Sequence, residues 1–288
     1  MMAPMSASPA IEVRDLRKNY GDMEAVAGID FQVQRGEIYG LLGPNGAGKT
    51  STVEILEGYR TRSSGTVRVL GHDPQTRPLE LRRRVGIVLQ SSGIYSHVRV
   101  GEVLAHFAGF YPHPRDVAEV IELVGLGEKR DERARRLSGG QRRRLDLALA
   151  LIGDPELVFL DEPTTGFDPA ARRTAWETIR SLKDLGKTVL LTTHYLDEAQ
   201  ELADRVAIIK GGRILAEGSP EQLGVGGGSR YRVAHLVDGE LVVHQTDDPT
   251  RLLHELTSAA LAEHRTLEGL SVTRPSLEEI YLELTAGA

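Results

Sequence analysis

Residues 43–50 read GPNGAGKT and follow the apolar run GEIYGLL at residues 36–42. The eight residues fit the pattern G-x-x-x-x-G-K-[ST] at every position, and the helical pattern KTSTVEILEGY begins inside them. Glycines let the backbone curl so that its N–H groups face an anion, and the helix adds the partial positive charge of its amino end. The stretch therefore predicts a phosphate-binding loop rather than a glycine-rich turn with an incidental lysine.

The side chains of this loop indicate how a nucleotide would be held. Lys49 is expected to reach the β- and γ-phosphates, and the Thr50 hydroxyl is expected to ligate Mg²⁺. The predicted nucleotide-binding residues of the loop are Gly43, Pro44, Asn45, Gly46, Ala47, Gly48, Lys49, Thr50 and Ser51.

A second pattern, LVFLDEP at residues 157–163, places two carboxylates after a nearly continuous apolar run. Such a run is typical of a parallel strand that is covered on both faces, and α/β folds bind ligands at the carboxyl ends of such strands. We therefore expect Asp161 to hold Mg²⁺ and Glu162 to polarise an attacking water. The alternative is a strand-end pair that caps the next turn, which the nearby phosphate loop makes less attractive.

The composition limits the class of protein. The chain has 288 residues, 40% hydrophobic, a formal net charge of -6 and no cysteine. Disulfides, thiolate zinc sites and a cysteine nucleophile are excluded, and the overall charge does not suit a polyanion-binding protein. Residues 1–10, MMAPMSASPA, lack the charged and apolar regions of a signal peptide, and no apolar run approaches the roughly 20 residues of a membrane helix. We expect a cytoplasmic protein that acts at a membrane only through a partner.

Strand-like runs alternate with helical patterns, which predicts an α/β domain with a mostly parallel core sheet. Residues 11–20 and 25–36 read as antiparallel strands, and residues 205–218 as a hairpin around Gly211-Gly212. The sequence GVGGGS at residues 224–229 suggests a flexible linker. We predict a disordered tail at residues 1–9, a nucleotide-binding domain at 10–223, a linker at 224–229 and an α+β accessory domain at 230–288.

A second anion-binding pattern, LSGGQRRRL, occupies residues 137–145. Ser138 and Gln141 have the spacing of a capping box at a helix start, and Gly139 and Gly140 remove side chains from the approach. The pattern predicts a capped helix with N–H groups that face outward, but it does not identify the anion that they meet.

The order of these motifs, followed by a histidine after the strand TVLLTTH, resembles the ATP-binding cassette (ABC) ATPases over residues 10–220. The resemblance implies a P-loop NTPase with a mostly parallel core sheet, an antiparallel β subdomain and a helical subdomain, which binds ATP and Mg²⁺. LSGGQ is the motif that separates this family from other P-loop proteins.

The resemblance assigns further residues. Tyr20 matches the aromatic residue that stacks on adenine, the alternative being a buried strand tyrosine; Gln90 matches a glutamine that touches Mg²⁺. His194 matches the histidine that contacts the γ-phosphate, so Glu162 and His194 are the expected catalytic residues and Thr50, Gln90 and Asp161 the expected metal ligands. The contacts implied with ATP held by a second copy, in a head-to-tail homodimer, are those of Ser138, Gly139, Gly140, Gln141 and Asp168.

More narrowly, EPTTGFDP, TTHYLDEAQELADR and RPSLEEIYLELT resemble the ATPases of daunorubicin-resistance type exporters of drugs and lipids. The resemblance implies a separate multi-spanning membrane permease as partner, at the cytoplasmic face of the membrane. Residues 91–104 are the candidate surface for that partner, although they equally fit an ordinary surface of the helical subdomain.

Two other classes remain as alternatives. A soluble ABC ATPase that acts on nucleic acid or ribosomes would use the arginines at positions 82–84, 133, 135–136 and 142–144. Such runs are usually solvated helix faces, so we expect no nucleic-acid partner. A regulatory protein with a degenerate site is disfavoured by the intact motifs. The accessory domain could brace a dimer, cover the partner interface, regulate turnover or only add stability.

Overall fold

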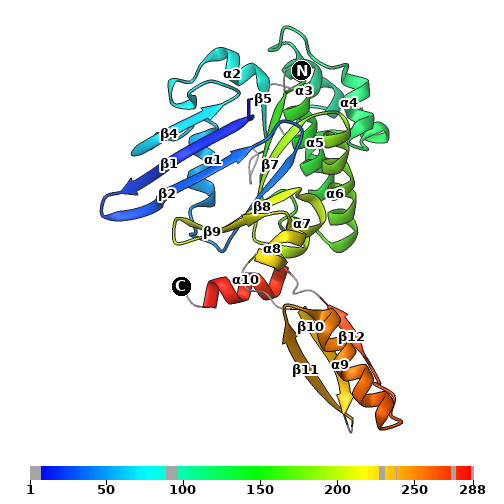
Figure 1. Cartoon of the computed structure of the whole chain (residues 1–288). Coiled ribbons are helices and arrows are strands. Elements are labelled where there is room, and N and C mark those ends of the chain that lie inside the picture. Colours follow the sequence, from blue (N-terminus) through cyan, green and yellow to red (C-terminus); the bar gives the residue numbers. More distant parts are fainter. Residues whose placement is uncertain (1–7, 89–96, 227–230, 238, 274–276, 287–288) are drawn as a thin grey trace, which may run out of the picture. The chain divides into compact units, whose positions relative to one another are not determined.

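The computed structural model describes residues 8–88, 97–226, 231–237, 239–273 and 277–286 (Figure 1). Its chain forms two compact units, residues 1–217 and residues 218–288. The first unit contains two sheets and the second unit one, and each unit has its own helices.

The core of the first unit is a sheet in the order β5-β6-β7-β3-β8-β9. Its strands are β3 (Ile38–Leu42), β5 (Val85–Val88), β6 (Leu157–Asp161), β7 (Thr188–Thr193), β8 (Arg205–Lys210) and β9 (Arg213–Gly218). The pairs from β5 to β8 are parallel, and every residue of β3 and β7 is buried, as expected for strands covered on both faces. The predicted parallel core and the predicted strands of the hairpin are confirmed.

The register of this sheet places the motifs at one edge. Asp161 pairs with Thr192, and Leu42 pairs with Thr193 on the other side of β7. The residues that follow β3, β6 and β7 therefore emerge side by side at the carboxyl ends of the strands. Parallel pairing thus brings the phosphate loop, the two carboxylates and His194 together.

One face of the core sheet is covered by helix α1 (Lys49–Leu56) and by an antiparallel sheet in the order β2-β1-β4. These strands are β1 (Ile11–Tyr20), β2 (Met23–Val33) and β4 (Ser64–Val69). The apolar side chains of α1, such as Val53 and Leu56, pack in one cluster with those of β1, β2, β4 and β6. The antiparallel pairing of β1 with β2, expected from the sequence, is confirmed.

The other face is covered by helices, which Figure 1 shows beside the core sheet. They are α3 (Val100–Ala108), α4 (Val117–Leu123), α5 (Gly139–Leu151), α6 (Pro169–Asp184) and α7 (Leu196–Leu202), and the short α2 (Leu79–Arg84) precedes β5. None of the helices in the described ranges combines the length and the apolar character that a membrane-spanning helix requires.

The second unit is an α+β structure. Strands β10 (Tyr231–Val237), β11 (Glu240–Thr246) and β12 (Ser271–Thr273) form an antiparallel sheet in the order β11-β10-β12. Helix α9 (Pro249–Ala262), which begins at the capping residue Asp248, contacts β10. Helix α10 (Leu277–Ala286) contacts α8 (Pro220–Gly226), and Arg232 of β10 forms an ion pair with Glu279 of α10.

The division between the units falls earlier than the composition suggests. The glycine-rich segment 224–229 predicts a linker, but α8 continues to Gly226 and belongs to the second unit. The reason is local, because the Ser219 hydroxyl accepts a hydrogen bond from the backbone N–H of Gln222 and starts this helix. Residues 227–229 lie outside the described residues, as do residues 1–7 of the predicted tail, while residues 8–9 have no helix or strand.

An ionic cluster joins the loops at the amino ends of three core strands. Glu156, before β6, accepts hydrogen bonds from Arg84, before β5, at 2.5 and 2.9 Å, and from Arg35, before β3, at 2.8 Å. These guanidinium groups, Arg84 foremost, lower the pKa of Glu156 from 4.5 to about 2. Because the folded-state pKa is lowered, the stabilisation is present above the unfolded pKa and is lost as the pH falls toward 2.

We therefore expect Glu156→Gln to lower the free energy of unfolding at pH 7 by about 1 kcal/mol or less, since the side chain is 42% exposed and solvent screens it. The difference from the unmodified chain should shrink as the pH falls from about 5 toward 2. Urea unfolding followed by the fluorescence of Trp176, the single tryptophan, measures it in the first unit. The control is Glu128→Gln at an exposed glutamate. A difference independent of pH would contradict the ionic interpretation.

Candidate functional site

The phosphate loop connects β3 to α1, and two of its three glycines, Gly43 and Gly48, occupy positions where a side chain would collide. Gly48 precedes α1 with φ 103°, a left-handed conformation, and a Cβ there would lie 2.5 Å from the carbonyl oxygen of Ala25. A Cβ on Gly43 would lie 2.2 Å from the carbonyl oxygen of Ile209. The loop is therefore wedged against β2 and β8, which holds its curled backbone in place.

Lys49 opens α1 and is 5% exposed. Its ammonium donates hydrogen bonds to the carbonyl oxygens of Gly43 at 2.7 Å and Pro44 at 3.2 Å, and it lies 3.9 Å from Glu162 Oε1. Burial lowers the pKa of Lys49, and the nearby carboxylates of Glu162 and Asp161 oppose that effect. The cation is thus held where the loop, the helix start and β6 meet.

Thr192, which the parallel register places beside Asp161, forms hydrogen bonds with Asp161 and with the backbone of Glu162. The Thr192 hydroxyl of β7 donates to Asp161 Oδ1 at 2.6 Å, and it accepts from the backbone N–H of Glu162 at 3.1 Å. The Thr192 carbonyl oxygen also accepts from that N–H, at 3.2 Å. Thr192 therefore sets the direction of the Asp161 carboxylate and of the chain as it leaves β6.

Glu162 has a left-handed backbone, with φ 46°, although it carries a side chain. Such a conformation costs roughly 1–3 kcal/mol and is frequent at functional sites. Glu162 Oε2 accepts from the Thr165 hydroxyl at 3.2 Å, and Oε1 lies 3.2 Å from His194 Nδ1. The carboxylate is thus directed between Lys49 and His194.

His194 follows β7 directly, and its ring is in contact with Tyr195, at a centroid distance of 4.1 Å. The guanidinium of Arg172, on α6, lies 4.6 Å from the centre of the Tyr195 ring on which it stacks. Arg172 is itself bonded to Asp197 at 3.0 Å. His194 therefore packs against Tyr195, and Tyr195 in turn packs against Arg172 of α6.

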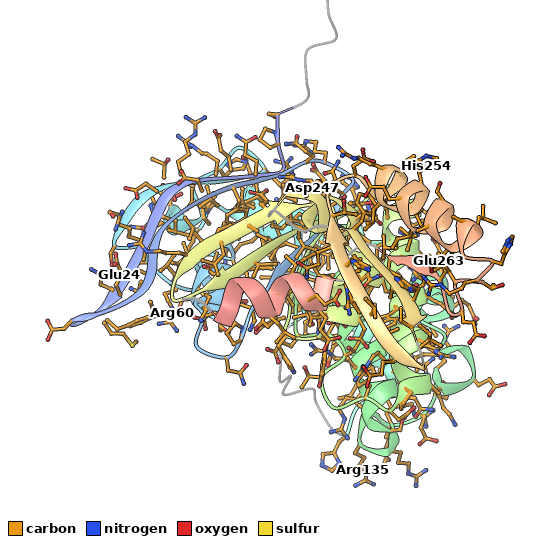
Figure 2. All side chains as sticks on the ribbon, turned by 60° about the horizontal axis from the view of Figure 1, so that its bottom comes forward. Glu24, Arg60, Arg135, Asp247, His254 and Glu263 are labelled. Atoms are coloured by element: carbon orange, nitrogen blue, oxygen red, sulfur yellow. The ribbon has the colours of Figure 1, made fainter. Side chains whose placement is uncertain are left out.

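Tyr20 ends β1 and its hydroxyl lies 3.1 Å from the Ser51 hydroxyl on α1. The cations of Lys18 and Arg60 lie 5.0 and 5.2 Å from the centre of its ring. Tyr20 is partly buried, so the alternative of a fully buried strand tyrosine does not hold. Arg60 is labelled in Figure 2, and its Nε is paired with Glu54 at 2.5 Å. An aromatic ring beside the phosphate loop is suited to stack on a base.

The stretch LSGGQ starts helix α5 with the predicted capping box. The Ser138 hydroxyl accepts from the backbone N–H of Gln141 at 3.2 Å, and the Gln141 side chain accepts from the N–H of Ser138 at 3.0 Å. A Cβ on Gly139 would meet nothing within 4 Å, so the approach to the helix start is open. The capped helix start predicted from the sequence is confirmed.

Asp168 lies beside this helix start. Its carboxylate caps α6, accepting from the backbone N–H groups of Ala170 at 3.0 Å and Ala171 at 2.9 Å. One open cleft is lined by Ser138, Gly139, Gly140 and Gln141 together with Asp168 and Glu162. The phosphate loop is not among the described residues that line it. The candidate residues therefore form two groups. The first surrounds the phosphate loop, the second surrounds the start of α5, and Glu162 belongs to both.

Two residues that support the site, Arg143 and Thr192, were not predicted from the sequence. Arg143, one turn into α5, donates to the backbone carbonyls of Asp161 at 2.8 Å and Pro163 at 3.2 Å and so ties the start of α5 to the end of β6. A hydroxyl at the end of the apolar strand TVLLTTH was a signal for Thr192. Three consecutive arginines gave no signal for which one faces inward. Gln90, expected to ligate Mg²⁺, lies outside the described residues.

The arginines considered for nucleic-acid binding are partly occupied within the fold. Arg84 is bonded to Glu156, Arg143 to the end of β6, and Arg144 to the carbonyl oxygen of Gly125 at 3.0 Å. Arg135 is exposed, and Figure 2 shows it at the outer end of the helical region. These contacts explain several of the basic side chains as structural.

The chemical groups around the phosphate loop fit a nucleoside triphosphate with a divalent cation. The wedged glycine backbone, the amino end of α1 and the Lys49 ammonium suit phosphate oxygens. The Asp161 carboxylate and the exposed Thr50 hydroxyl are the oxygen ligands that Mg²⁺ prefers. Burial, followed by the charge of Asp161, raises the pKa of the neighbouring Glu57 to about 8, so this carboxyl adds less negative charge near pH 7.

Comparisons with known proteins agree with this chemistry. Residues 26–165 match the family described as ABC transporter. The chain is 40% identical to the daunorubicin/doxorubicin resistance ATP-binding protein DrrA of Streptomyces peucetius, covering 96% of this chain and 92% of that protein. It is also 40% identical to the Nod factor export ATP-binding protein I of Burkholderia orbicola, covering 92% and 85%.

A solved ATP-binding subunit of an ABC transporter has the same fold, with a TM-score of 0.70, 23% identity and coverage of 96% and 99%. The α/β cassette fold expected from the sequence is thus confirmed, and the alternative of a soluble ATPase acting on nucleic acid is not favoured. From the ordered motifs, the wedged phosphate loop and these similarities it follows that the chain belongs to the ABC transporter family, as an ATP-binding subunit with ATPase activity.

Proposed function

We propose that two copies of this chain dimerise head-to-tail around two ATP molecules and power the export of a hydrophobic drug or lipid through a separate membrane permease. The observation that carries the proposal is that the LSGGQ helix start opens into a cleft which, among the described residues, the phosphate loop of the same copy does not line. A second copy with two-fold symmetry would bring each helix start to the other copy's phosphate loop.

Within one copy, the phosphates of ATP would lie against the backbone of residues 43–48, with Lys49 and Ser51 at the start of α1 and Tyr20 against the adenine. Mg²⁺ would be held by Thr50, Gln90 and Asp161, and would neutralise charge on the β- and γ-phosphates. The Thr192 hydroxyl supports this arrangement, because it directs the Asp161 carboxylate.

Glu162 would orient the attacking water and accept its proton, and His194 would steady the γ-phosphate. The 3.2 Å between Glu162 Oε1 and His194 Nδ1 supports a shared task. Phosphoryl transfer depends mainly on positioning and on charge stabilisation, so prearranged side chains of this kind account for most of the catalysis.

The other copy would complete the site through the N–H groups at the start of α5 and through Asp168. Gly139 leaves the approach open, and the capping box keeps the helix start in shape. ATP then favours the closed dimer because only the closed state adds these contacts, and hydrolysis removes them. Closure and opening would move the permease.

The export proposal rests on the functions for which two relatives are named, daunorubicin/doxorubicin resistance and Nod factor export. We place the protein at the cytoplasmic face of the membrane, bound to a permease of several hydrophobic spans of about 20 residues each. Residues 97–104 of the candidate partner surface 91–104 are described, and they include the start of α3. The cassette, which forms the first unit up to Glu217, would do this work, with the second unit, residues 218–288, as an addition.

We expect Glu162→Gln to retain ATP binding and to lower kcat by about 10²- to 10⁴-fold, because the amide keeps the shape but removes the general base. Lys49→Ala should weaken binding as well as turnover, since it removes the phosphate cation. Nucleotide binding and phosphate release by the purified variants measure both effects. Turnover near that of the unmodified chain in Glu162→Gln would disprove the role given to Glu162.

Ser138→Arg should leave ATP binding by the monomer intact and prevent ATP-dependent dimerisation and hydrolysis, because the bulky cation blocks the helix start. Size-exclusion chromatography of the Glu162→Gln background with ATP measures the dimer. The matched control is Ser258→Arg, at an exposed serine of α9. If dimers persist in Ser138→Arg, Ser138 is a helix cap and the head-to-tail arrangement is wrong.

Inverted membrane vesicles that carry this chain and its permease partner should accumulate daunorubicin when ATP is supplied. Vesicles with Glu162→Gln should not, because transport requires hydrolysis. Uptake is measured from the fluorescence of the drug. ATP-independent uptake, or equal uptake without the permease, would contradict the export proposal and leave the ATPase activity as it stands.

A further inference from the structure

Glu198, on α7, is a buried carboxyl group outside the groups of residues described so far. Its exposed fraction is 0%. Its Oε1 accepts hydrogen bonds from the Thr164 hydroxyl at 2.6 Å and from Trp176 Nε1 at 3.2 Å. Its Oε2 has no hydrogen-bond partner among the residues that the structure describes. Burial of a carboxyl group with one oxygen unpaired costs free energy, which indicates that this residue does more than fill space.

The two residues that donate hydrogen bonds to Glu198 belong to the segments that carry the proposed catalysis. Thr164, itself fully buried, lies two residues after Glu162 and four before Asp168. Trp176 is on α6, the helix that Asp168 caps. Burial raises the pKa of Glu198, and the hydrogen bonds from Thr164 and Trp176 oppose that effect. Glu198 is itself on α7, which begins at Leu196, directly after His194 and Tyr195, so the carboxyl group links the segment 162–168 to the helix that follows His194.

We propose that Glu198 is a positioning residue for ATP hydrolysis, which holds the Glu162–Asp168 segment and the start of α7, directly after His194, in one arrangement through its hydrogen bonds with Thr164 and Trp176. The proposal rests on the roles proposed above for His194 and Asp168. Glu198 itself touches neither nucleotide nor water in this scheme. Its carboxyl group joins α7 to the turn after β6, through Thr164, and to α6, through Trp176.

The arrangement has a physical consequence for kinetics. Lys49 is held by hydrogen bonds to the carbonyl oxygens of Gly43 and Pro44, and the loop itself lies against β2 and β8. None of these contacts involves α7. Loss of the Glu198 bonds should therefore leave the binding of ATP nearly unchanged and impair the step that needs Glu162, His194 and Asp168 together. A loss of this kind lowers kcat while KM stays constant.

The test uses the full chain with Glu198→Met, which keeps the volume and removes the acceptor, and with Glu198→Gln, which keeps one acceptor oxygen for both donors. We expect kcat to fall about tenfold or more in Glu198→Met, with KM for ATP within about twofold, and to recover to within about threefold in Glu198→Gln. Glu201→Met, on the exposed side of the same helix, is the matched control and should leave kcat unchanged.

Two further measurements separate positioning from general damage to the fold. Trp176 is the single tryptophan, so its emission reports the Nε1 hydrogen bond directly. The emission should shift to shorter wavelength in Glu198→Met and not in Glu198→Gln.

Thr164→Val removes the other donor, and the double variant Thr164→Val with Glu198→Met should lose no more activity than Glu198→Met alone, because both act through one contact. If Glu198→Met does not fold, Thr164→Val beside Thr164→Ser gives the same comparison.

Unchanged kcat in Glu198→Met or in Thr164→Val would overturn the proposal, as would fully additive losses in the double variant. Asp168→Ala and His194→Ala are measured in parallel. If they lower kcat and the Glu198 variants do not, the positioning role alone fails. If they leave kcat unchanged, the proposed roles of Asp168 and His194 fail, and the Trp176 emission still decides whether Glu198 holds α6.

Discussion

The parallel pairing of β6 with β7, and of β7 with β3, is the constraint on which the site depends. Parallel strands end at the same edge, so the register of Asp161 with Thr192 and of Leu42 with Thr193 fixes where three separate segments leave the sheet. The phosphate loop ends 111 residues before Asp161, and His194 follows Glu162 by 32 residues, so none of the three segments can be placed beside the others without this register.

The site concentrates charge and strain that the surrounding packing has to support. Lys49 is nearly buried, Glu162 has a left-handed backbone, and both lie where the loop is wedged between β2 and β8. The helices on the opposite face add polar ties into the same edge, through Arg143 from α5 and through Arg172 and Trp176 from α6. Helices that cover the sheet thus also determine how the residues at its carboxyl edge are held.

Much of the first unit could be predicted from the sequence. The loop at 43–50, the apolar strand before Asp161, the hairpin around Gly211-Gly212 and the capping box of α5 each carry a local signal, and local signals are set by neighbouring residues. The boundary of the second unit is different, because a glycine-rich composition indicates flexibility whereas the packing of α8 with α10 is a contact between distant residues.

The sequence by itself determined which chemical groups are present and in what order: an ammonium, a pair of carboxylates, a histidine and two glycine-rich helix starts. The tertiary structure alone decided which of them meet. Thr192 bonds to Asp161 only because β7 lies beside β6. Arg143 reaches the end of β6 because its side of α5 packs on the core sheet. Glu198 of α7 bonds to Thr164 after β6 and to Trp176 of α6. The physical reason is that such contacts join residues about 20 to 35 positions apart, a spacing that no local periodicity encodes.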